Sequence, residues 1–424
     1  MTLSDLPQDQ LDTLLTTLRE DYSALQARGL KLDLTRGKPS AEQLDLSDEL
    51  LGLPGRGNYR ADDGTDVRNY GGLDGLPQLR QIFAELLDVP VAQLMAANGA
   101  SLTLMHDTIA YAMLHGTQDS ERPWSQEETV KFICPAPGYD RHFALCEEFG
   151  IEMVTVAMNE DGPDAEAVAA LVADDPTIKG MWVVPTYANP DGSVVSQEVA
   201  ARLTSMPTAA PDFRIIWDNA YSVHHLTTEE AKTADALSLA AVAGNPDRIL
   251  LYASTSKITF AGSGVAFFGS SPANVTWFKS HLAKQSIGPD KVNHLRHALF
   301  FGDADGVRAH MAKHRAILAP KFEAVVGALE TRLGGRDVAT WTTPVGGYFV
   351  SLDVVPGTAS RVVELAKAAG IVLTPAGATY PYGTDPRDQN IRLAPTFPPL
   401  EEVQVAVDGV ATCVLLAAAE AATA

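Results

Sequence analysis

A lysine inside a cluster of hydroxyl side chains is the residue of this sequence best suited to covalent chemistry. Lys257 follows Ser254, Thr255 and Ser256, and this run comes directly after the apolar segment 248–252, which predicts a buried strand. A lysine forms an imine with a carbonyl where a desolvated or electropositive site keeps its amine unprotonated. The neighbouring hydroxyls can bind a phosphate at the same place. The alternative interpretation is a solvated lysine in a loop. The other polar residues of the sequence distinguish an imine-forming lysine from a solvated one.

Two more polar segments follow apolar runs of strand character. Asp218 and Tyr221 come after 213–217, and a buried carboxylate without a partner is costly, which favours a cationic ligand. Asn189 comes just after 180–186, in a turn where Asn, Pro and Gly are also expected on backbone grounds alone. The sequence thus places a carboxylate, a phenol and an amide where predicted strands end.

Small residues open a predicted helix near residue 100. Gly99, Ala100 and Ser101 precede the apolar helical pattern 102–109. Backbone amide groups at a helix N-terminus form a cradle for phosphate. A simple serine cap is the alternative, because serine is a preferred N-cap residue.

The elements that must position these side chains alternate along the middle of the chain. Strand-like runs occur at 129–134, 151–157, 180–186, 213–217, 248–252 and 265–269, with helical patterns between them. This alternation predicts an α/β fold with a mainly parallel sheet and helices on both faces. Ligands of such sheets bind at the carboxyl ends of the strands.

The two ends of the chain predict smaller elements. An amphipathic N-terminal helix is expected to stop at Gly29. After a helical stretch, 272–333, the sequence predicts a strand at 347–354 and helices at 359–369 and 399–421. These later elements indicate a second, smaller α+β domain.

The length of the chain also predicts two domains. With 424 residues, 46% of them hydrophobic, the chain is too long for one hydrophobic core. We expect an N-terminal arm and part of the small domain in 1–65, a large domain in 66–300 and a small C-terminal domain in 301–424.

Charge and cysteine content narrow the class of protein. The 32 basic and 53 acidic residues give a net charge of −21, which argues against nucleic-acid and anionic-membrane surfaces. The three cysteines lack metal-ligand spacing, so we expect no disulfide framework and no metal site. Residues 1–10 lack the apolar core of a secretory signal, and acidic residues interrupt the apolar C-terminal segment. We therefore expect a cytoplasmic protein that does not cross a membrane.

The order of these motifs, with others between them, resembles one enzyme family from residue 32 to residue 397. The chain looks like a fold-type I pyridoxal-phosphate enzyme of the class I aminotransferase family, most like a divergent bacterial branch of aspartate aminotransferases. The resemblance implies a mainly parallel, mixed seven-stranded sheet in a large domain that binds pyridoxal 5'-phosphate. It also implies a smaller domain built from both chain ends.

The resemblance implies roles for the residues around the cofactor. Lys257 would hold the cofactor as a Schiff base and move the substrate proton, while Asp218 would pair with the pyridine nitrogen and keep it protonated. Tyr221 and Asn189 would bond the ring oxygen, and Tyr139 would stack on the ring.

Further positions follow from the same resemblance. His142 would support the aspartate, and Tyr70 would reach the phosphate of a partner subunit, which implies a homodimer with shared active sites. The residues expected to bind the phosphate are Gly99, Ala100, Ser101, Ser254 and Ser256. Taken without the resemblance, Tyr139 would be a core aromatic residue, His142 a loop residue and Tyr70 a turn residue.

Substrate contacts are implied at both chain ends. Arg392 matches the arginine that clamps the α-carboxylate of the substrate, a task suited to a planar bidentate fork. Gly37 belongs to a loop that covers the substrate. The candidates for the distal carboxylate of a dicarboxylic substrate are Arg36, Arg141, Lys291 and Arg296. Each of these basic residues would otherwise be a surface charge.

One part of the family pattern is missing. Most members carry a phosphate-binding arginine at the position of residue 265 or 266, whereas the segment 258–266 contains no arginine. The phosphate would then depend on backbone amides, hydroxyls or a base from elsewhere in the chain.

The expected reaction is ping-pong transfer of an amino group between an L-amino acid and a 2-oxo acid, with aspartate and 2-oxoglutarate as the favoured pair. Another specificity, for alanine or aromatic substrates, and a β-lyase or decarboxylase on the same fold are alternatives. A non-enzymatic effector domain of a transcription regulator is a further alternative, but the short acidic N-terminus offers no DNA-binding module.

Overall fold

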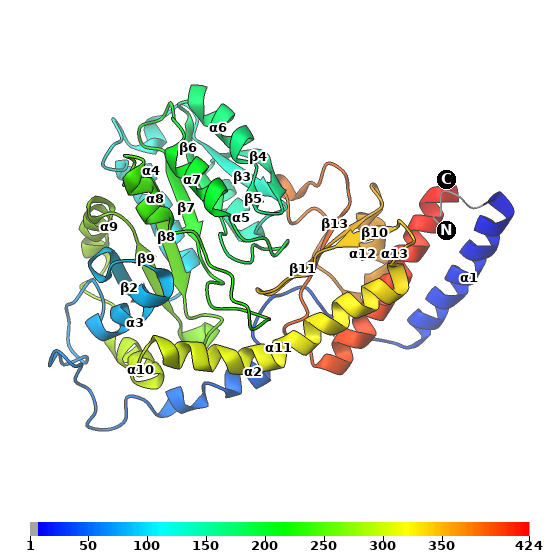
Figure 1. The fold of residues 1–424 in the computed structure, drawn as a ribbon, viewed down its shortest axis with the longest axis horizontal. Helices are drawn as coiled ribbons and strands as arrows, with labels where there is room; N and C mark the ends of the chain where they lie inside the picture. Colours follow the sequence, from blue (N-terminus) through cyan, green and yellow to red (C-terminus); the bar gives the residue numbers. More distant parts are fainter. Residues whose placement is uncertain (1–6, 424) are drawn as a thin grey trace.

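A computed structural model describes residues 7–423 of the chain. Two packed units make up the molecule, one built on a large sheet and the other on a small sheet, and helix α11 (Ala304–Leu333) runs along both of them (Figure 1). Residues 1–6 of the N-terminal segment lie outside the described residues.

The large sheet has eight strands and is mainly parallel. Its order is β2-β9-β8-β7-β6-β3-β4-β5. The strands are β2 (Leu94–Asn98), β3 (Lys131–Ala136), β4 (Glu152–Asn159), β5 (Gly162–Pro163), β6 (Ile178–Val183), β7 (Arg214–Asp218), β8 (Ile249–Ser254) and β9 (Val265–Gly269). The α/β fold and the mainly parallel sheet are confirmed, but the expected number of seven strands is one too few. The additional strand is β5, a two-residue antiparallel edge strand that is too short for a hydrophobic period to reveal.

Both faces of this sheet are covered, as its apolar strands require. Ile215 and Trp217 pack into one hydrophobic cluster, and Ile216, which points the other way, packs into a second. The helices α3 (Pro77–Leu87), α6 (Ala165–Asp174), α7 (Gln197–Ser205), α8 (Ala236–Val242) and α10 (Lys291–Phe301) contribute to the first cluster. The helices α4 (Ser101–His115), α5 (Asp140–Glu148) and α9 (Pro272–Gln285) contribute to the second.

The parallel strands end at one edge of the sheet, and this places several polar side chains together. Strands β3, β6, β7 and β8 are mutually parallel neighbours, with β7 ending at Asp218 and β8 at Ser254. Because side chains alternate along a strand, Asp218 points to the same face as Ile216, toward α4 and α5.

The smaller unit draws on both ends of the chain. Its three-stranded antiparallel sheet consists of β10 (Ala339–Trp341), β11 (Val350–Val354) and β13 (Asn390–Leu393), and β1 (Leu32–Asp33) pairs with β12 (Ile371–Val372). The helices of this unit are α1 (Gln8–Ala27), α12 (Ala359–Ala368), α13 (Leu400–Thr423) and the second half of α11, while the short α2 (Ala41–Asp45) lies beside α11. Helices α1 and α13 lie side by side (Figure 1). The helix expected before Gly29 is present, and Gly29 follows it with a φ of 62°. The domain boundaries at 65 and 300 stay predictions.

The C-terminal helix differs from one expectation. By length and composition α13 is apolar enough to cross a membrane, although the sequence analysis expected no such segment. Within the protein, 72% of its most apolar window is buried. Its apolar residues form the centre of the hydrophobic cluster of the smaller unit, together with α1 and α12.

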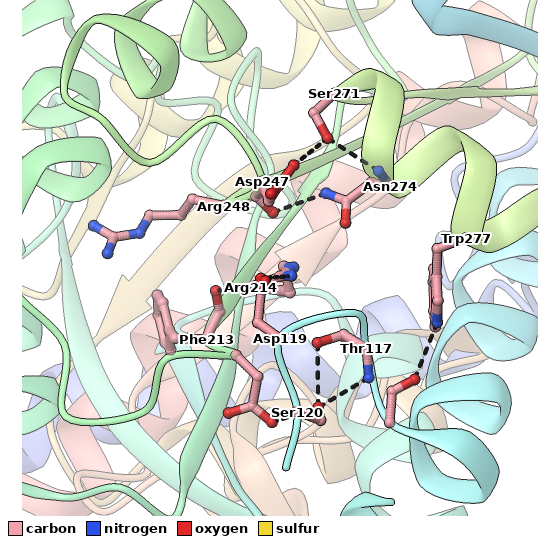
Figure 2. A network of polar contacts seen from close by, with 12 residues as sticks. Thr117, Asp119, Ser120, Phe213, Arg214, Asp247, Arg248, Ser271, Asn274 and Trp277 are labelled. Atoms are coloured by element: carbon pink, nitrogen blue, oxygen red, sulfur yellow. Dashed lines mark hydrogen bonds and ion pairs between the residues drawn. The ribbon is translucent and has the colours of Figure 1, made fainter. Parts of the chain in front are cut away.

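A polar network closes the opposite edge of the large sheet (Figure 2). Arg214, at the start of β7, donates to Asp119 at 2.5 Å. Asp247, just before β8, accepts a hydrogen bond from Ser271, whose hydroxyl in turn caps α9 by accepting from the Asn274 amide at 3.0 Å. Polar residues at this edge therefore fix the register of strands and helices far from the predicted site.

Candidate active site

Asp218 is a buried carboxylate with one oxygen bonded and one free. It is 2% exposed, and its Oδ2 lies 3.0 Å from Nε2 of His142. The His142 ring stacks on Trp182 with the ring centroids 4.2 Å apart and the planes 7° apart, which fixes its orientation. Oδ1 of Asp218 is buried and has no hydrogen-bond partner within the described part of the chain. A buried oxygen of this kind calls for a donor from a ligand.

Lys257 lies beside two buried phenols. Its Nζ is 4.8 Å from the ring centroid of Tyr221 and 6.0 Å from that of Tyr348. Burial raises the pKa of Tyr221 well above its ordinary value, with the Asp218 charge adding to the shift. The Tyr221 hydroxyl is therefore neutral and available as a donor at physiological pH. Among the described residues, no carboxylate forms an ion pair with Nζ of Lys257, so the two aromatic rings are the contacts of this nitrogen that the structure shows.

The turn after β3 brings an aromatic ring to the same place. Gly138 is required there, because a Cβ on it would lie 2.4 Å from the Pro135 carbonyl oxygen. The next residue, Tyr139, meets the His142 ring edge-on at 4.9 Å. Burial raises the pKa of Tyr139 to about 12, partly opposed by the charge of Lys257.

Asn189 and Arg392 meet although 203 positions of the chain separate them. Nη1 of Arg392 donates to Oδ1 of Asn189 at 3.3 Å, while Nδ2 of Asn189 is buried and finds no hydrogen-bond partner in residues 7–423. The guanidinium also lies 5.0 Å from the ring centroid of Phe349. Arg392 is on β13 of the small sheet and Asn189 follows β6 of the large sheet, so the two units form this site together.

The predicted phosphate-binding residues form a small group of hydroxyls and amides. Ser101 is the first residue of α4, and Ser254 donates to Ser256 at 3.2 Å. A Cβ on Gly264 would lie 2.9 Å from the Ser256 hydroxyl and 3.1 Å from the Gly99 carbonyl oxygen, so the two predicted segments are close neighbours. Among the described residues, no lysine or arginine hydrogen-bonds to any of the five expected phosphate ligands, Gly99, Ala100, Ser101, Ser254 and Ser256.

The N-terminal glycine loop covers one wall of the site. A Cβ on Gly37 would lie 2.4 Å from Cζ of Phe349, so only glycine permits this approach. The cavity below has a volume of about 720 Å³. It is lined by Thr35, Arg36, Gly37, Lys38, Tyr139, Asp140, Arg141, Asn189, Tyr221, Lys257, Phe349, Val363, Lys367, Val372, Leu373, Thr374, Pro375 and Arg392.

The four candidates for a distal carboxylate separate into two groups. Arg36 and Arg141 line the cavity and are exposed at it. Lys291 instead donates to the Asn69 carbonyl at 2.7 Å, and Arg296 donates to the Leu53 carbonyl at 2.9 Å. The structure of a single chain therefore leaves Lys291 and Arg296 outside the cavity, where each donates to at least one backbone carbonyl.

Tyr70 also lies away from the cavity of its own chain. It is 83% exposed on a loop that Lys291 holds through the carbonyl of Asn69. Its predicted reach to a partner subunit stays a prediction.

The sequence analysis missed several residues of the site. The sequence indicated no role for Asp140, but its Oδ1 accepts from Nη1 of Arg392 at 2.7 Å. Thr374 lies 3.5 Å from Nη2 of the same arginine, and Phe349 covers its face. Since these contacts join distant segments, the only local signal was the position of Asp140 directly after Tyr139.

Comparison with known proteins shows that this chain is similar to one protein family over nearly its whole length. The family model described as aspartate amino-transferase matches residues 6–424. The chain is similar to a putative aminotransferase of Mycolicibacterium smegmatis, with 60% identity over 99% of both chains. It is also 57% identical to the aspartate aminotransferase of Corynebacterium glutamicum over 99% of this chain and 97% of that one. The crystal structure of an aspartate transaminase from Corynebacterium glutamicum superposes with a TM-score of 0.98 at 57% identity, covering 100% of this chain and 99% of the other.

Proposed function

The chain belongs to the aspartate aminotransferase family, and from this premise we propose that it transfers the amino group of aspartate to 2-oxoglutarate, giving oxaloacetate and glutamate. The observation that carries the proposal is one cavity lined by an amine, Lys257, and a carboxylate clamp, Arg392, with the free oxygen of Asp218 buried beside it. An amine supplies covalent attachment and proton transfer, and a guanidinium binds an α-carboxylate.

The residues present fit pyridoxal 5'-phosphate. Two buried polar atoms that have no partner in the described part of the chain, Oδ1 of Asp218 and Nδ2 of Asn189, match the ring nitrogen and the ring oxygen of that cofactor. Lys257 would hold it covalently, and Tyr139 would cover its ring. The phosphate would lie among the hydroxyls and amides of Gly99, Ala100, Ser101, Ser254 and Ser256. The order of the motifs along the chain and the two unpartnered atoms support this placement of the cofactor.

Each residue of the chain would contribute a defined task. When bound, the cofactor supplies an electron sink that makes the Cα–H bond of an amino acid acidic. Arg392 and Asn189 would orient the α-carboxylate, so that Cα faces Nζ of Lys257. The Lys257 amine would take the proton from Cα of the amino acid. It would then deliver that proton to the carbon that keeps the amino group after the transfer. Asp218, oriented by His142, would keep a positive charge on the cofactor ring.

The preference for aspartate is supported by basic residues at the mouth of the cavity. Arg36 and Arg141 are exposed there, and a second carboxylate of the substrate would find a cation in either of them. The name of the Corynebacterium glutamicum relative points to the same substrate. A panel of amino acids should therefore give the highest kcat/KM for aspartate and glutamate. Higher values for alanine or aromatic amino acids would remove this substrate assignment and leave the class of enzyme intact.

Replacing the lysine tests the reaction directly. Lys257→Ala should abolish transfer from aspartate, and borohydride treatment of the wild-type enzyme should attach the cofactor mass to the peptide that carries Lys257. Lys284→Ala, an exposed lysine on α9, is the matched control and should retain both properties. An active Lys257→Ala enzyme would contradict the proposal. Release of ammonia or carbon dioxide from aspartate alone, instead of stoichiometric oxaloacetate, would favour the lyase or decarboxylase alternative.

We further propose a homodimer with shared sites. Tyr70 is 83% exposed and Ile287 64% exposed, and their loops touch, since a Cβ on Gly288 would lie 2.5 Å from the Gly71 carbonyl oxygen. Two large apolar side chains at one exposed loop pair fit an interface better than solvent. Sedimentation equilibrium should give twice the chain mass, and a monomer with full activity would contradict the proposal.

The proposed location is the cytoplasm. All three cysteines, Cys134, Cys146 and Cys413, are buried free thiols, as is usual in a reducing compartment. Cell fractionation would test this, and recovery of the protein in a membrane or extracellular fraction would contradict it.

A further inference from the structure

The arginine of the proposed carboxylate clamp already holds a carboxylate of the protein. Asp140 Oδ1 lies 2.7 Å from Nη1 of Arg392, and the two residues are 252 positions apart in the chain. Asp140 is the first residue of α5 on the large unit, whereas Arg392 is on β13 of the small unit. The ion pair therefore bridges the cavity in which the substrate is proposed to bind.

Asp140 occupies one of the donor nitrogens of Arg392. Nε of Arg392 is fully buried and has no partner within the described residues. Nη2 has only a long contact of 3.5 Å to Thr374. A carboxylate that binds end-on to Nη1 and Nη2 must compete for Nη1 with Asp140 at 2.7 Å, and Asn189 also lies 3.3 Å from that nitrogen.

The two partners of this pair differ in how well they tolerate separation. The Arg392 side chain is 7% exposed, and a buried guanidinium without an anion is costly. The Asp140 side chain is 35% exposed and lies in the first turn of a helix, where the backbone amides stabilise a negative charge. Asp140 can therefore move away when another carboxylate arrives, while Arg392 needs one at all times.

We propose that Asp140 is a resident carboxylate that occupies the substrate clamp of the free enzyme and must be displaced by the α-carboxylate of every substrate. This inference rests on the proposed function. Only a ligand with a carboxylate in the right place replaces the contact that Asp140 gives up, so an amine without one gains nothing from Arg392. Asp140 thereby sets the affinity for substrates and selects for the carboxylate that both amino acids and 2-oxo acids share.

Removing the charge of Asp140 should increase the affinity for every carboxylate ligand of Arg392 by the same factor. We expect Asp140→Asn to lower the Kd of succinate, an unreactive dicarboxylate, by about threefold to tenfold in the holoenzyme, as fits the loss of one partly exposed competing ion pair. The KM values of aspartate and 2-oxoglutarate should fall by the same factor, because the lost contact competes with the binding of either substrate. Calorimetry and initial rates measure these quantities.

Two control variants distinguish competition for Arg392 from a general effect of charge and from a failure to fold. Glu148→Gln removes one negative charge from the exposed end of the same helix, outside the cavity, and should bind succinate like the wild type. Asp140→Ser provides a second variant in case the asparagine variant does not fold. Equal or weaker succinate binding by a folded Asp140 variant would overturn the proposal and make Asp140 a positioning residue for Arg392.

A measurement on the wild-type enzyme completes the test. A crystal structure of the holoenzyme with succinate should show Asp140 away from Nη1 of Arg392. Succinate bound to Arg392 with the pair to Asp140 still in place would overturn the proposal. Because succinate binding requires no turnover, these results stand apart from the outcome of the aminotransferase assays.

Discussion

At the scale of single residues, the site is marked by polar groups that the protein satisfies only in part. Within the described residues, Asp218 has one bonded oxygen and one without a partner, and Asn189 has a bonded oxygen and a nitrogen without a partner. In each case the contact inside the protein fixes the side chain, and the other atom is the one that we propose binds the cofactor. This arrangement orients a binding group at the cost of one buried, unsatisfied atom.

The support of Asp218 by His142 can be tested by its removal. His142→Phe keeps a ring that can stack on Trp182 but leaves both oxygens of Asp218 without a partner from the protein. A hydrogen bond to a charged group contributes about 1.5–3 kcal/mol, so we expect kcat to fall about tenfold to a hundredfold. Steady-state kinetics measure this, and His106→Asn, an exposed histidine on α4, serves as the control. An unchanged kcat would show that Asp218 needs no support.

The sequence alone predicted most of these residues but not their partners. Lys257, Asp218, Tyr221 and Asn189 were predicted because they come shortly after predicted strands and because their order resembles that of one enzyme family. The contact of Asp140 with Arg392 could not be found, since it depends on how the two units pack. The same reason explains Lys291 and Arg296, whose charges the sequence shows but whose backbone carbonyl partners it does not.

At the scale of elements, strands with a clear apolar pattern were predicted and short ones were missed. Strand β9 (Val265–Gly269) agrees with its predicted bounds, and the other predicted strands of the large sheet differ by a few residues. The sequence did not predict β2, although it has five residues, or the shorter strands β1, β5, β10, β12 and β13. Two or three residues of strand carry no measurable period, so only pairing with a neighbour defines them.

A buried arginine at the start of β8 holds the end of a neighbouring helix, and its loss should destabilise the fold. Nη1 of Arg248 donates to the carbonyls of Thr204 at 3.0 Å and Met206 at 2.6 Å, at the C-terminus of α7 (Figure 2 shows the arginine). Burial lowers the pKa of Arg248 to about 10, which leaves it charged at neutral pH. Arg248→Met leaves these carbonyls unsatisfied and should lower the free energy of unfolding by about 2–4 kcal/mol.

Urea denaturation with a matched variant checks this effect. Arg202 is on the same helix, α7, where it forms an exposed ion pair with Glu166. Arg202→Met should cost about 0–1 kcal/mol, because surface ion pairs contribute little. Equal losses in the two variants would contradict a special role for Arg248.

At the scale of the whole molecule, buried histidines connect segments that are far apart in the chain. On α11, Nδ1 of His314 lies 2.9 Å from Nε2 of Gln43, and its Nε2 lies 3.0 Å from Nε2 of His310. His310 continues to the carbonyl of Ile258 at 2.8 Å, next to Lys257. The N-terminal segment, the long helix and the loop of the proposed catalytic lysine thus share one buried polar network.

The lowered pKa values of buried histidines on α10 and α11 predict how the stability of the molecule depends on pH. Burial lowers the pKa of His314 to about 3 and the pKa values of His294 and His297 to about 4, below the ordinary value of 6.5. Below pH 6.5 the unfolded chain binds protons that the folded chain does not, so stability falls as pH decreases toward the folded pKa values. Each group contributes a slope of up to about 1.4 kcal/mol per pH unit in that window. Asp191, whose pKa burial raises to about 6, works in the opposite direction between pH 4 and 6 and offsets part of the loss.

Chemical denaturation at a series of pH values between 7 and 5 should therefore show a steep loss of unfolding free energy. His314→Gln keeps a polar side chain opposite Gln43 and His310 but removes one titrating group, so its slope should be lower by about one proton, or about 1.4 kcal/mol per pH unit. The same change at His106, which is partly exposed at the surface of α4, should leave the slope as in the wild type. If the His314 variant kept the full slope, protonation of the α11 network would not be the cause of the acid sensitivity. A lower slope would mean that protonation of His314 on unfolding accounts for its share of the acid sensitivity of the whole molecule.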